Sequence, residues 1–167
     1  MGYTHDTEFA QFIAPHQIIK TAGSWTDTLN AGVIRSERAQ AASGFSLFVP
    51  LLVPSNGAPL RGARLKSVEL HYRISGAAAG AFAVELERMT INAAGVVSGA
   101  VVAVSLDAAH ATDIQRRSVG DHRMLVSLDV PVWVDDDDAY WLVCTLNAAS
   151  STAFGLSGAV VRYDFRA

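Results

Sequence analysis

The densest group of candidate metal ligands in the sequence is the run of four aspartates from Asp135 to Asp138. Calcium takes about six to eight oxygen ligands, and its loops usually alternate acidic positions and place a glycine at the sharp turn. This run has neither feature, and neighbouring carboxylates repel one another. We interpret it as a solvated turn that also keeps a strand edge from associating, with a calcium site as the alternative.

Histidine and cysteine are too sparse for a motif-based metal site. The single cysteine, Cys144, excludes zinc held by a Cys/His cluster as well as an intrachain disulfide. No two histidines have the i+2 or i+4 spacing of a metal motif; they are His5, His16, His71, His110 and His122. A histidine–carboxylate site assembled by the fold stays open. We expect no metal and no cofactor, a buried inert Cys144, and histidines at the surface or at strand ends.

Two patterns are candidates for hydrolytic chemistry. Glu85 and Glu87 are spaced to face the same side of a strand, which would suit a glycosidase if a cleft lay over them. Ser157, between Gly155 and Gly158, approximates a nucleophile elbow but lacks the spacing of the second glycine. No glycine-rich phosphate loop occurs. We therefore interpret the glutamates as exposed strand charges and expect no catalytic residues and no enzyme activity.

Three tryptophans, Trp25, Trp133 and Trp141, could stack on sugar rings. Trp133 and Trp141 flank the acidic run, where one of them could be exposed for glycan binding. Tryptophan is a large apolar residue, so core packing is expected for at least one of the three.

The amino-acid composition restricts the classes of partner that the protein can have. The chain has 167 residues, 50% of them hydrophobic, which is enough to bury the core of one domain without disulfides or metal. A formal net charge of −3 argues against a nucleic-acid partner, because such binders usually carry a basic surplus. Basic residues gather only in short groups, at 61–66 and 116–117. Charged residues make up 17%, which is low and suggests that a partner covers part of the surface.

Targeting signals are not visible. No run approaches the ~20 apolar residues of a membrane-spanning helix. The first twenty residues lack the basic leader and apolar stretch of a signal peptide. We expect no membrane partner and a protein that is made and folded in a cytoplasm.

The elements that must position these residues are strands. Residues 124–130 and 140–146 alternate apolar and polar side chains with period two, and many of them are aromatic or β-branched. Because the acidic run lies between the two segments, they predict a β-hairpin with Asp135–Asp138 at its tip.

Short turn signals separate further strands along the chain. These are expected at 33–34, 45–50, 65–75, 82–91, 96–106 and 153–165. In 65–75, Lys66 should share the buried face with Val68 and Leu70, and Leu65 should lie on the polar face. Residues 107–120 lose the period and predict a long loop or a short helix. The count of about eight strands predicts an all-β antiparallel sandwich or barrel.

Three segments resemble a jelly-roll module of tailed-bacteriophage structural proteins: RGARLKSVELHYRIS, HRMLVSLDVPVWVDDDDAYWLVCTLNA and GLSGAVVRYDF. Such modules share a G-x-x-L-x-S-V-x-x-x-Y strand, an acidic tip before a tyrosine, and a final G-x-x-V-x-Y strand. The matching residues are Gly62, Leu65, Ser67, Val68 and Tyr72, then Asp135 through Tyr140, then Gly158, Val161 and Tyr163. The resemblance spans roughly residues 44 to 165 and implies an antiparallel jelly-roll sandwich of about eight strands.

For function, the resemblance implies a virion structural protein. The favoured role is a capsid decoration (cement) protein or head spike that stabilises the shell through protein–protein contacts. It implies a homotrimer as the favoured oligomer, the major capsid protein as partner, and a location in the virion after folding in the host cytoplasm. We expect residues 1–40 to form an N-terminal arm or the first strands, and residues 41–167 to form the jelly-roll domain, as one folding unit.

Two other function classes stay open. One is a tail-associated or glycan-binding module that recognises a host-surface carbohydrate through loops at one end of the sandwich and through Trp133 or Trp141. The other is a small hydrolase, which has no motif of its own in this sequence.

Overall fold

The computed structural model describes residues 6–30, 32–55 and 62–166. Strands make up most of them, with one 3-10 helix, η1, and one short α-helix, α1. The bounds are β1 Asp6–Ile13, η1 Pro15–Gln17, β2 Ile19–Lys20, β3 Trp25–Asn30, β4 Val33–Arg38, β5 Ser43–Leu51, β6 Ala63–Gly76, β7 Ala81–Ile91, β8 Val97–Val102, β9 Val104–Leu106, α1 Asp113–Arg116, β10 Gly120–Trp133, β11 Asp138–Ala148 and β12 Thr152–Arg166. Within these residues no helix is long and apolar enough to span a membrane.

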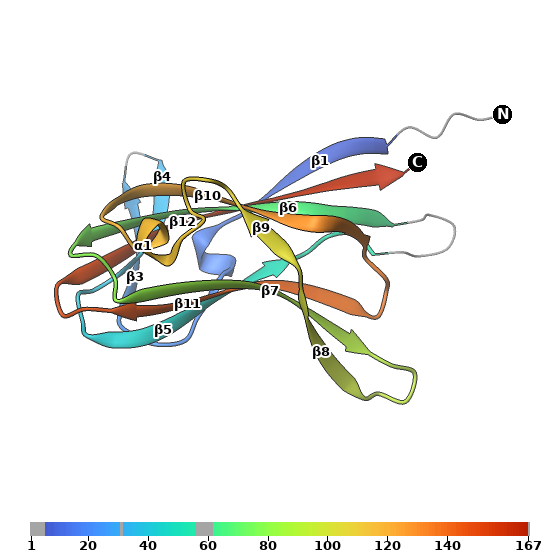
Figure 1. Ribbon diagram of the computed structural model, residues 1–167, viewed down its shortest axis with the longest axis horizontal. Coiled ribbons are helices and arrows are strands. Elements are labelled where there is room, and N and C mark those ends of the chain that lie inside the picture. The colour runs from blue at the N-terminus through green and yellow to red at the C-terminus, as the bar shows by residue number, and fades with distance from the viewer. Residues whose placement is uncertain (1–5, 31, 56–61, 167) are drawn as a thin grey trace.

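The strands form two antiparallel sheets packed face to face, as Figure 1 shows. The seven-stranded sheet has the order β3-β4-β12-β6-β10-β9, with β1 paired to β12, and the five-stranded sheet has the order β2-β5-β11-β7-β8. Within them, β4-β12-β6-β10 and β5-β11-β7-β8 follow the strand order of a jelly roll. The predicted all-β antiparallel jelly-roll sandwich of about eight strands is therefore confirmed.

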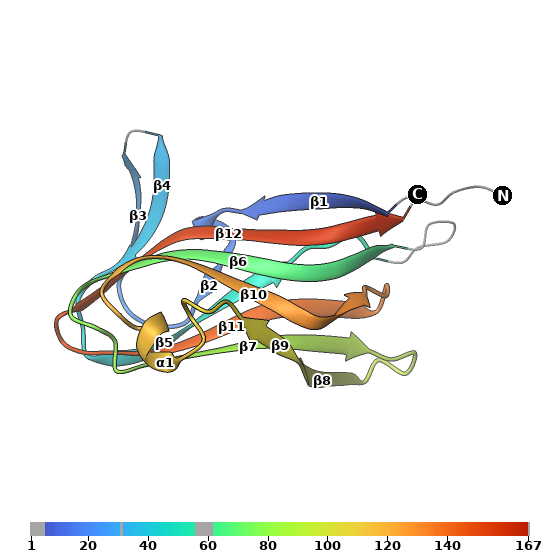
Figure 2. The same cartoon turned by 45° about the horizontal axis from the view of Figure 1, so that its top comes forward.

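The remaining strands extend the edges of this jelly roll. Residues 6–30 supply β1 and β3 to the seven-stranded sheet and β2 to the five-stranded sheet, and β9 pairs with β10 at the far edge of the seven-stranded sheet. Figure 2 shows the hairpin of β3 and β4 rising away from the rest of the seven-stranded sheet. The predicted break at 107–120 contains α1, which confirms a short helix between strands.

The core forms between the two sheets, from the residues that face inward on each strand. On β11, Tyr140, Leu142, Cys144 and Leu146 point inward and are buried, as their spacing predicts. Phe154 of β12 lies at the centre of an aromatic cluster inside the sandwich. Its ring centroid lies 5.4 Å from that of Phe45, 5.5 Å from Tyr72, 6.2 Å from Trp25 and 6.4 Å from Phe82. Rings in such offset and edge-to-face contacts add to the free energy of burial.

The predicted hairpin around the aspartates is wrong. Strand β10 pairs with β6 and β9, whereas β11 pairs with β5 and β7, so the two strands lie in different sheets. The acidic run is the connection between the sheets. Two strands with one buried face each show the same alternation whether they pair with each other or pack across a core, so the local pattern could not separate the two arrangements.

The single strand expected at 96–106 is also two strands. It breaks at Ala103, so that β8 lies in the five-stranded sheet and β9 in the seven-stranded sheet. The segment contains no proline and no charge, and its one glycine, Gly99, lies inside β8. Nothing in the local sequence marks the crossing.

The predicted faces of β6 are reversed at its N-terminal end. Leu65 is fully buried, and Lys66 points outward to Glu8 and Asp164. In the pairing with β12, Arg162 is opposite Ser67 and Tyr163 is opposite Leu65, so Lys66 is the extra residue of a β-bulge. A bulge shifts the register by one residue and exchanges the two faces of the strand before it.

Gly158 occupies a second irregularity, and its replacement should be costly. Its φ is +122°, and a Cβ there would lie 2.6 Å from the carbonyl oxygen of Ile13 and 2.8 Å from Cζ of Phe12. We expect Gly158→Ala to lower the free energy of unfolding by about 1–3 kcal/mol, because both strain and a clash are introduced. Urea unfolding measures this change.

Gly155 provides the matched control for this variant. It lies on the same strand, and an added Cβ would meet nothing closer than Cβ of Arg73 at 3.8 Å. Gly155→Ala should change the stability by less than about 0.5 kcal/mol. Equal losses for the two variants would show that the position of Gly158 is not special.

Candidate functional site: an apolar groove on the five-stranded sheet

The outer face of the five-stranded sheet carries a groove of about 440 Å³. The residues that alternate inward on β5, β7 and β11 fill the core, so those between them face outward. The groove crosses all five strands. Its lining includes Ile19, Phe48, Glu87, Met89, Val97 and Trp141. Most of these groups are apolar, although they lie on the solvent side of the sheet.

Trp141 lies in the middle of this groove. Its register partners are Pro50 on β5 and Glu87 on β7, so a proline and a carboxylate flank the indole. The side chain is only partly buried. Phe48, also partly buried, faces outward on β5, where its register partner is Val143. The groove therefore presents aromatic surface that the core does not use.

Strand β8 keeps one side of the groove open. Gly99 is opposite Met89 on β7, and a Cβ at Gly99 would touch only the carbonyl oxygen of Arg88, at 3.9 Å. Because Gly99 has no side chain, the surface beside Met89 is not covered. On either side of it, Val97 and Val101 are exposed by 58% and 67%.

Glu85 and Glu87 share this outer face, as their spacing predicts. Glu87 lines the groove, and Glu85 lies one step along β7, opposite Val143. Both are exposed, and neither forms an ion pair with any described residue. Glycosidases need two carboxyl groups in different surroundings, one to act as acid and one as base or nucleophile. Two exposed groups on one strand, neither of them in an ion pair with a described residue, do not meet that condition.

The other two tryptophans have different surroundings. Trp25 packs edge-on against Phe45 and Phe154, and its Nε1 donates to the carbonyl oxygen of Ala22 at 2.8 Å. Trp133 ends β10 in the seven-stranded sheet, with the guanidinium of Arg64 5.7 Å from its ring centroid. Of the two tryptophans that flank the acidic run, Trp141 is therefore the one that lies in the groove.

A larger cavity, of about 660 Å³, lies beside the hairpin of β3 and β4. Polar residues on its lining include Thr26, Glu37, Gln40 and Arg73. The aromatic residue at its edge, Phe154, is buried in the core with 2% exposure. A ligand in this cavity would find no aromatic surface, so we place the candidate site in the groove of Trp141.

The acidic run is less uniform than its sequence predicts. Asp135, Asp136 and Asp137 are exposed, whereas Asp138 begins β11 and its side chain is mostly buried. Asp138 accepts hydrogen bonds from the hydroxyls of Thr90 and Tyr140, and its carboxylate lies 3.9 Å from Arg88. Among the described residues no three His, Cys, Asp or Glu side chains lie close enough together to hold a metal ion.

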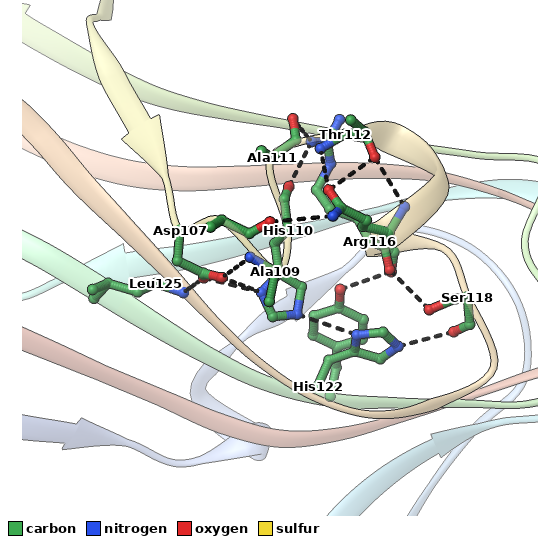
Figure 3. A network of polar contacts seen from close by, with 12 residues as sticks. Asp107, Ala109, His110, Ala111, Thr112, Arg116, Ser118, His122 and Leu125 are labelled. Atoms are coloured by element: carbon green, nitrogen blue, oxygen red, sulfur yellow. Dashed lines mark hydrogen bonds and ion pairs between the residues drawn. The ribbon is translucent and has the colours of Figure 1, made fainter.

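A partly buried histidine network, which the sequence did not suggest, joins the segment 107–119 to the sheets (Figure 3). Nδ1 of His110 lies 2.8 Å from Asp107, and Nε2 of His110 lies 3.2 Å from Nδ1 of His122. Nε2 of His122 then lies 2.9 Å from the carbonyl oxygen of Ser118, and the His122 ring stacks on Tyr72. The two histidines are twelve residues apart, so no sequence motif could bring them together.

The acceptors at the two ends of this network determine which histidine nitrogens donate. The Asp107 carboxylate already accepts hydrogen bonds from the backbone N–H groups of Ala109 and Leu125, and a carbonyl oxygen can only accept. The nitrogens of His110 and His122 that face these acceptors must therefore donate. Burial raises the pKa of Asp107, but the hydrogen bonds from Leu125 and His110 outweigh it and leave that pKa below its usual value.

The network resembles a proton relay but has no nucleophile at its end. Ser118 contributes its carbonyl oxygen, while its hydroxyl donates to the carbonyl oxygen of Gln115 at 2.9 Å. Acyl transfer needs a hydroxyl or thiol within reach of the base. The arrangement instead holds the crossing segment in place. Arg116 contributes to this through a hydrogen bond from its Nε to the carbonyl oxygen of Phe82 at 2.9 Å.

The cysteine and the other histidines take no part in the groove. Cys144 is fully buried as expected, and burial raises the pKa of its thiol to about 12. His71 lies on the outer face of β6, with its Nε2 2.6 Å from Glu69, and His16 is exposed. His5 and Arg61 lie outside the described residues.

Ion pairs connect side chains on the outer face of the seven-stranded sheet. Because they contain carboxylates, the stability of the protein should depend on pH. Arg123 and His71 hydrogen-bond to Glu69 and, although burial opposes them, lower its pKa. Burial raises the pKa of Asp164, but hydrogen bonds from Arg64 and Lys66 more than offset it and leave that pKa lowered. A carboxyl group whose folded-state pKa is lowered stabilises the protein above its unfolded-state pKa, and that contribution disappears as pH falls through the folded value.

The thermal midpoint should therefore fall as the pH drops below about 4.5, the ordinary pKa of a glutamate, because Glu69 and Asp164 gain protons there more readily in the unfolded chain than in the folded protein. Melting curves recorded by circular dichroism across this range test the decline. The Glu69→Gln and Asp164→Asn variants should start less stable and show a shallower decline. A wild-type slope that neither variant changes would assign the acid sensitivity to other groups.

Comparison with solved structures finds distant likeness to carbohydrate-binding modules. TmCBM61, solved with beta-1,4-galactotriose, gives a TM-score of 0.34 at 9% identity over 96% of this chain and 88% of that one. The xylan-binding module CBM86 from Roseburia intestinalis gives 0.35 at 9% identity, over 95% and 96% of the two chains. An arabinose-bound α-L-arabinofuranosidase gives 0.35 at 13% identity, over 95% of this chain and 23% of that one.

At these TM-scores and identities, the ligands of those proteins cannot be carried over to this chain. No protein-family model matches the sequence, and no curated protein matches it significantly. Nothing in the comparisons shows a bacteriophage origin. The virion location and the trimer thus remain expectations from the motif resemblance.

Proposed function

We propose that this protein is a glycan-binding module and that the groove around Trp141 is its binding site. One observation carries the proposal: the indole of Trp141 is partly exposed in a groove on the outer face of a sheet whose core is already filled. A sugar ring has an apolar C–H face and a polar rim. An aromatic side chain stacks against the C–H face, and a neighbouring polar group, here Glu87, can accept hydrogen bonds from the hydroxyls of the rim.

The shape of the groove favours an oligosaccharide over a single sugar. Its lining runs from Ile19 on β2 to Val97 on β8 and so crosses every strand of the sheet. Neighbouring strands lie about 4.8 Å apart, so five strands extend over about 19 Å. An open groove of that length accommodates a chain of several sugar units.

A binding screen tests the proposal with the wild-type protein. Retention on insoluble polysaccharides and quenching of tryptophan fluorescence by soluble oligosaccharides should identify at least one ligand. Because Trp141 would lie in the contact, bound sugar should change its emission. Absence of retention and of quenching across neutral, basic and acidic glycans would overturn the proposal.

A second candidate, the assembly role implied by the motif resemblance, is favoured by strand β8. This strand forms an edge of the five-stranded sheet, and the segment 96–106 around it carries no charge. Soluble proteins usually protect such edges with lysine, proline or a bulge, and an unprotected edge pairs readily with another chain.

Light scattering on the purified protein tests this role at the level of the oligomer. The resemblance predicts a trimer, and retention of the protein on purified capsids would place it in a virion. Val101→Lys puts a charge on the edge strand and should weaken any association through it. A wild-type protein that stays monomeric at high concentration and is not retained on capsids would exclude the assembly role.

A further inference from the structure

We propose that the groove selects glycans by charge, and that it binds chains carrying ammonium groups in preference to neutral chains and disfavours uronic acids. This inference rests on the proposed function and names the class of glycan for that same site. It is carried by the charges that face the groove and by the surroundings of the bases nearest to it.

The acidic groups of this face are aligned with its aromatic surface. Glu87 is the register partner of Trp141, and Glu85 is the register partner of Val143, so both carboxylates follow the strand that holds the indole. Both side chains are exposed, and no ion pair connects either of them to a described residue. A ligand stacked on Trp141 would have carboxylates along one side.

The bases nearest to the groove are engaged elsewhere. Arg88 borders the groove, but its guanidinium lies 3.9 Å from the carboxylate of Asp138, which begins the strand that holds Trp141. Lys20 follows Ile19 of the groove, but its Nζ donates to the hydroxyl of Ser36 at 2.7 Å and lies 3.6 Å from Asp27. Of the two charged residues that line the groove, Arg88 is therefore paired with Asp138, and Glu87 forms no ion pair with a described residue.

The size of the effect follows from the exposure of these groups. An exposed ion pair contributes up to about 1 kcal/mol, which is about a fivefold change in Kd, and salt screens it. A cationic amino sugar gains this attraction on top of stacking, and a uronate in the same place meets repulsion of similar size. Apolar stacking does not depend on salt in this way, so the two contributions can be separated.

The test compares three hexasaccharides at mildly acidic pH, where the amines are protonated and most glutamate stays ionised. The probes are the β-1,4-linked glucosamine hexamer, cellohexaose and an oligogalacturonate hexamer. The first two differ only in an ammonium group or a hydroxyl at each C2. Isothermal titration should give a Kd about fivefold lower for the glucosamine hexamer than for cellohexaose, with oligogalacturonate weakest. High salt should reduce the preference.

The variant Glu85→Gln/Glu87→Gln should remove the preference and keep the stacking contribution. Glu37→Gln/Asp121→Asn is its matched control, because it removes the same number of exposed carboxylates from the seven-stranded sheet, leaving the groove intact. The control should behave as the wild type. If both double variants lose the preference equally, net charge and not the groove is responsible, and the inference is overturned.

The remaining outcomes separate the inference from the proposed function. A glucosamine hexamer that fails to bind, or binds no more tightly than cellohexaose, overturns the charge selectivity. The glycan-binding function survives that result if a neutral glycan still binds in a manner that depends on Trp141. If no glycan binds at all, both proposals are overturned.

Discussion

Replacing Trp141 with alanine should raise the Kd for a bound oligosaccharide about thirtyfold. An aromatic side chain at the centre of a binding surface typically contributes about 2 kcal/mol or more, and each 1.4 kcal/mol is about a tenfold change in affinity. Trp141 meets this description, because it lies in the middle strand of the sheet with Glu87 and Pro50 as its register partners. Isothermal titration with the best ligand from the screen measures the change.

The fold should survive this substitution. The inward residues on either side of it, Tyr140 and Leu142, form the core contacts of β11, whereas the indole lies on the outer face and is only partly buried. Circular dichroism should show an unchanged spectrum and a thermal midpoint lowered by only a few degrees. If Trp141→Ala loses both binding and structure, Phe48→Ala is the second variant to measure, because it removes the neighbouring aromatic ring of the groove.

Trp133→Ala is the matched control. It also removes one tryptophan, but from β10 of the seven-stranded sheet, where the ring lies beside Arg64. Its affinity for glycans should stay within about twofold of the wild type, because Trp133 does not line the groove. If Trp133→Ala lost binding while Trp141→Ala kept it, the site would have to be moved to the other sheet.

The largest effect on stability is expected for Phe154→Ala, which should lower the free energy of unfolding by about 3–5 kcal/mol. Phe154 is 2% exposed and packs against aromatic side chains from four other strands, two in each sheet. Its removal leaves a cavity that the close-packed rings around it cannot fill. Domains of this size are stable by only about 5–15 kcal/mol, so the loss is a large share of the total.

Urea unfolding measures this loss, and two further variants keep the prediction testable. Phe154→Leu retains most of the apolar volume and should remain folded with a smaller loss, even if the alanine variant does not fold. Leu29→Ala removes a side chain that is 73% exposed on β3 and should change stability by less than about 0.5 kcal/mol. A loss for Phe154→Ala no larger than that for Leu29→Ala would contradict the central place of the aromatic cluster.

The candidate site could be assembled only in part from the sequence. The sequence identified Trp141 as one of three tryptophans that could stack on a sugar, and it interpreted Glu85 and Glu87 as exposed charges on one strand. Their meeting in one groove depends on the register of β7 against β11, which pairs residues 54 positions apart, and on Gly99 of β8 leaving the surface open. The network of His110 and His122 could not be predicted either, because a segment without periodicity brings the two rings together.

The sequence by itself determined that the fold is an all-β antiparallel sandwich and, away from the bulge at Lys66, which residues of a strand share a face. Alternation with period two is a property of each strand alone, so it correctly placed Cys144 in the core, whereas the exposure of Trp141 rather than Trp133 in a groove was left open. Only the tertiary structure decided which strands pair. The choice of partner depends on contacts between distant segments and on bulges such as that at Lys66, which reverse the faces of a strand. For that reason the acidic run from Asp135 to Asp138, expected at the tip of a hairpin, connects two sheets, and the surface most suited to a ligand lies on the outer face of one of them.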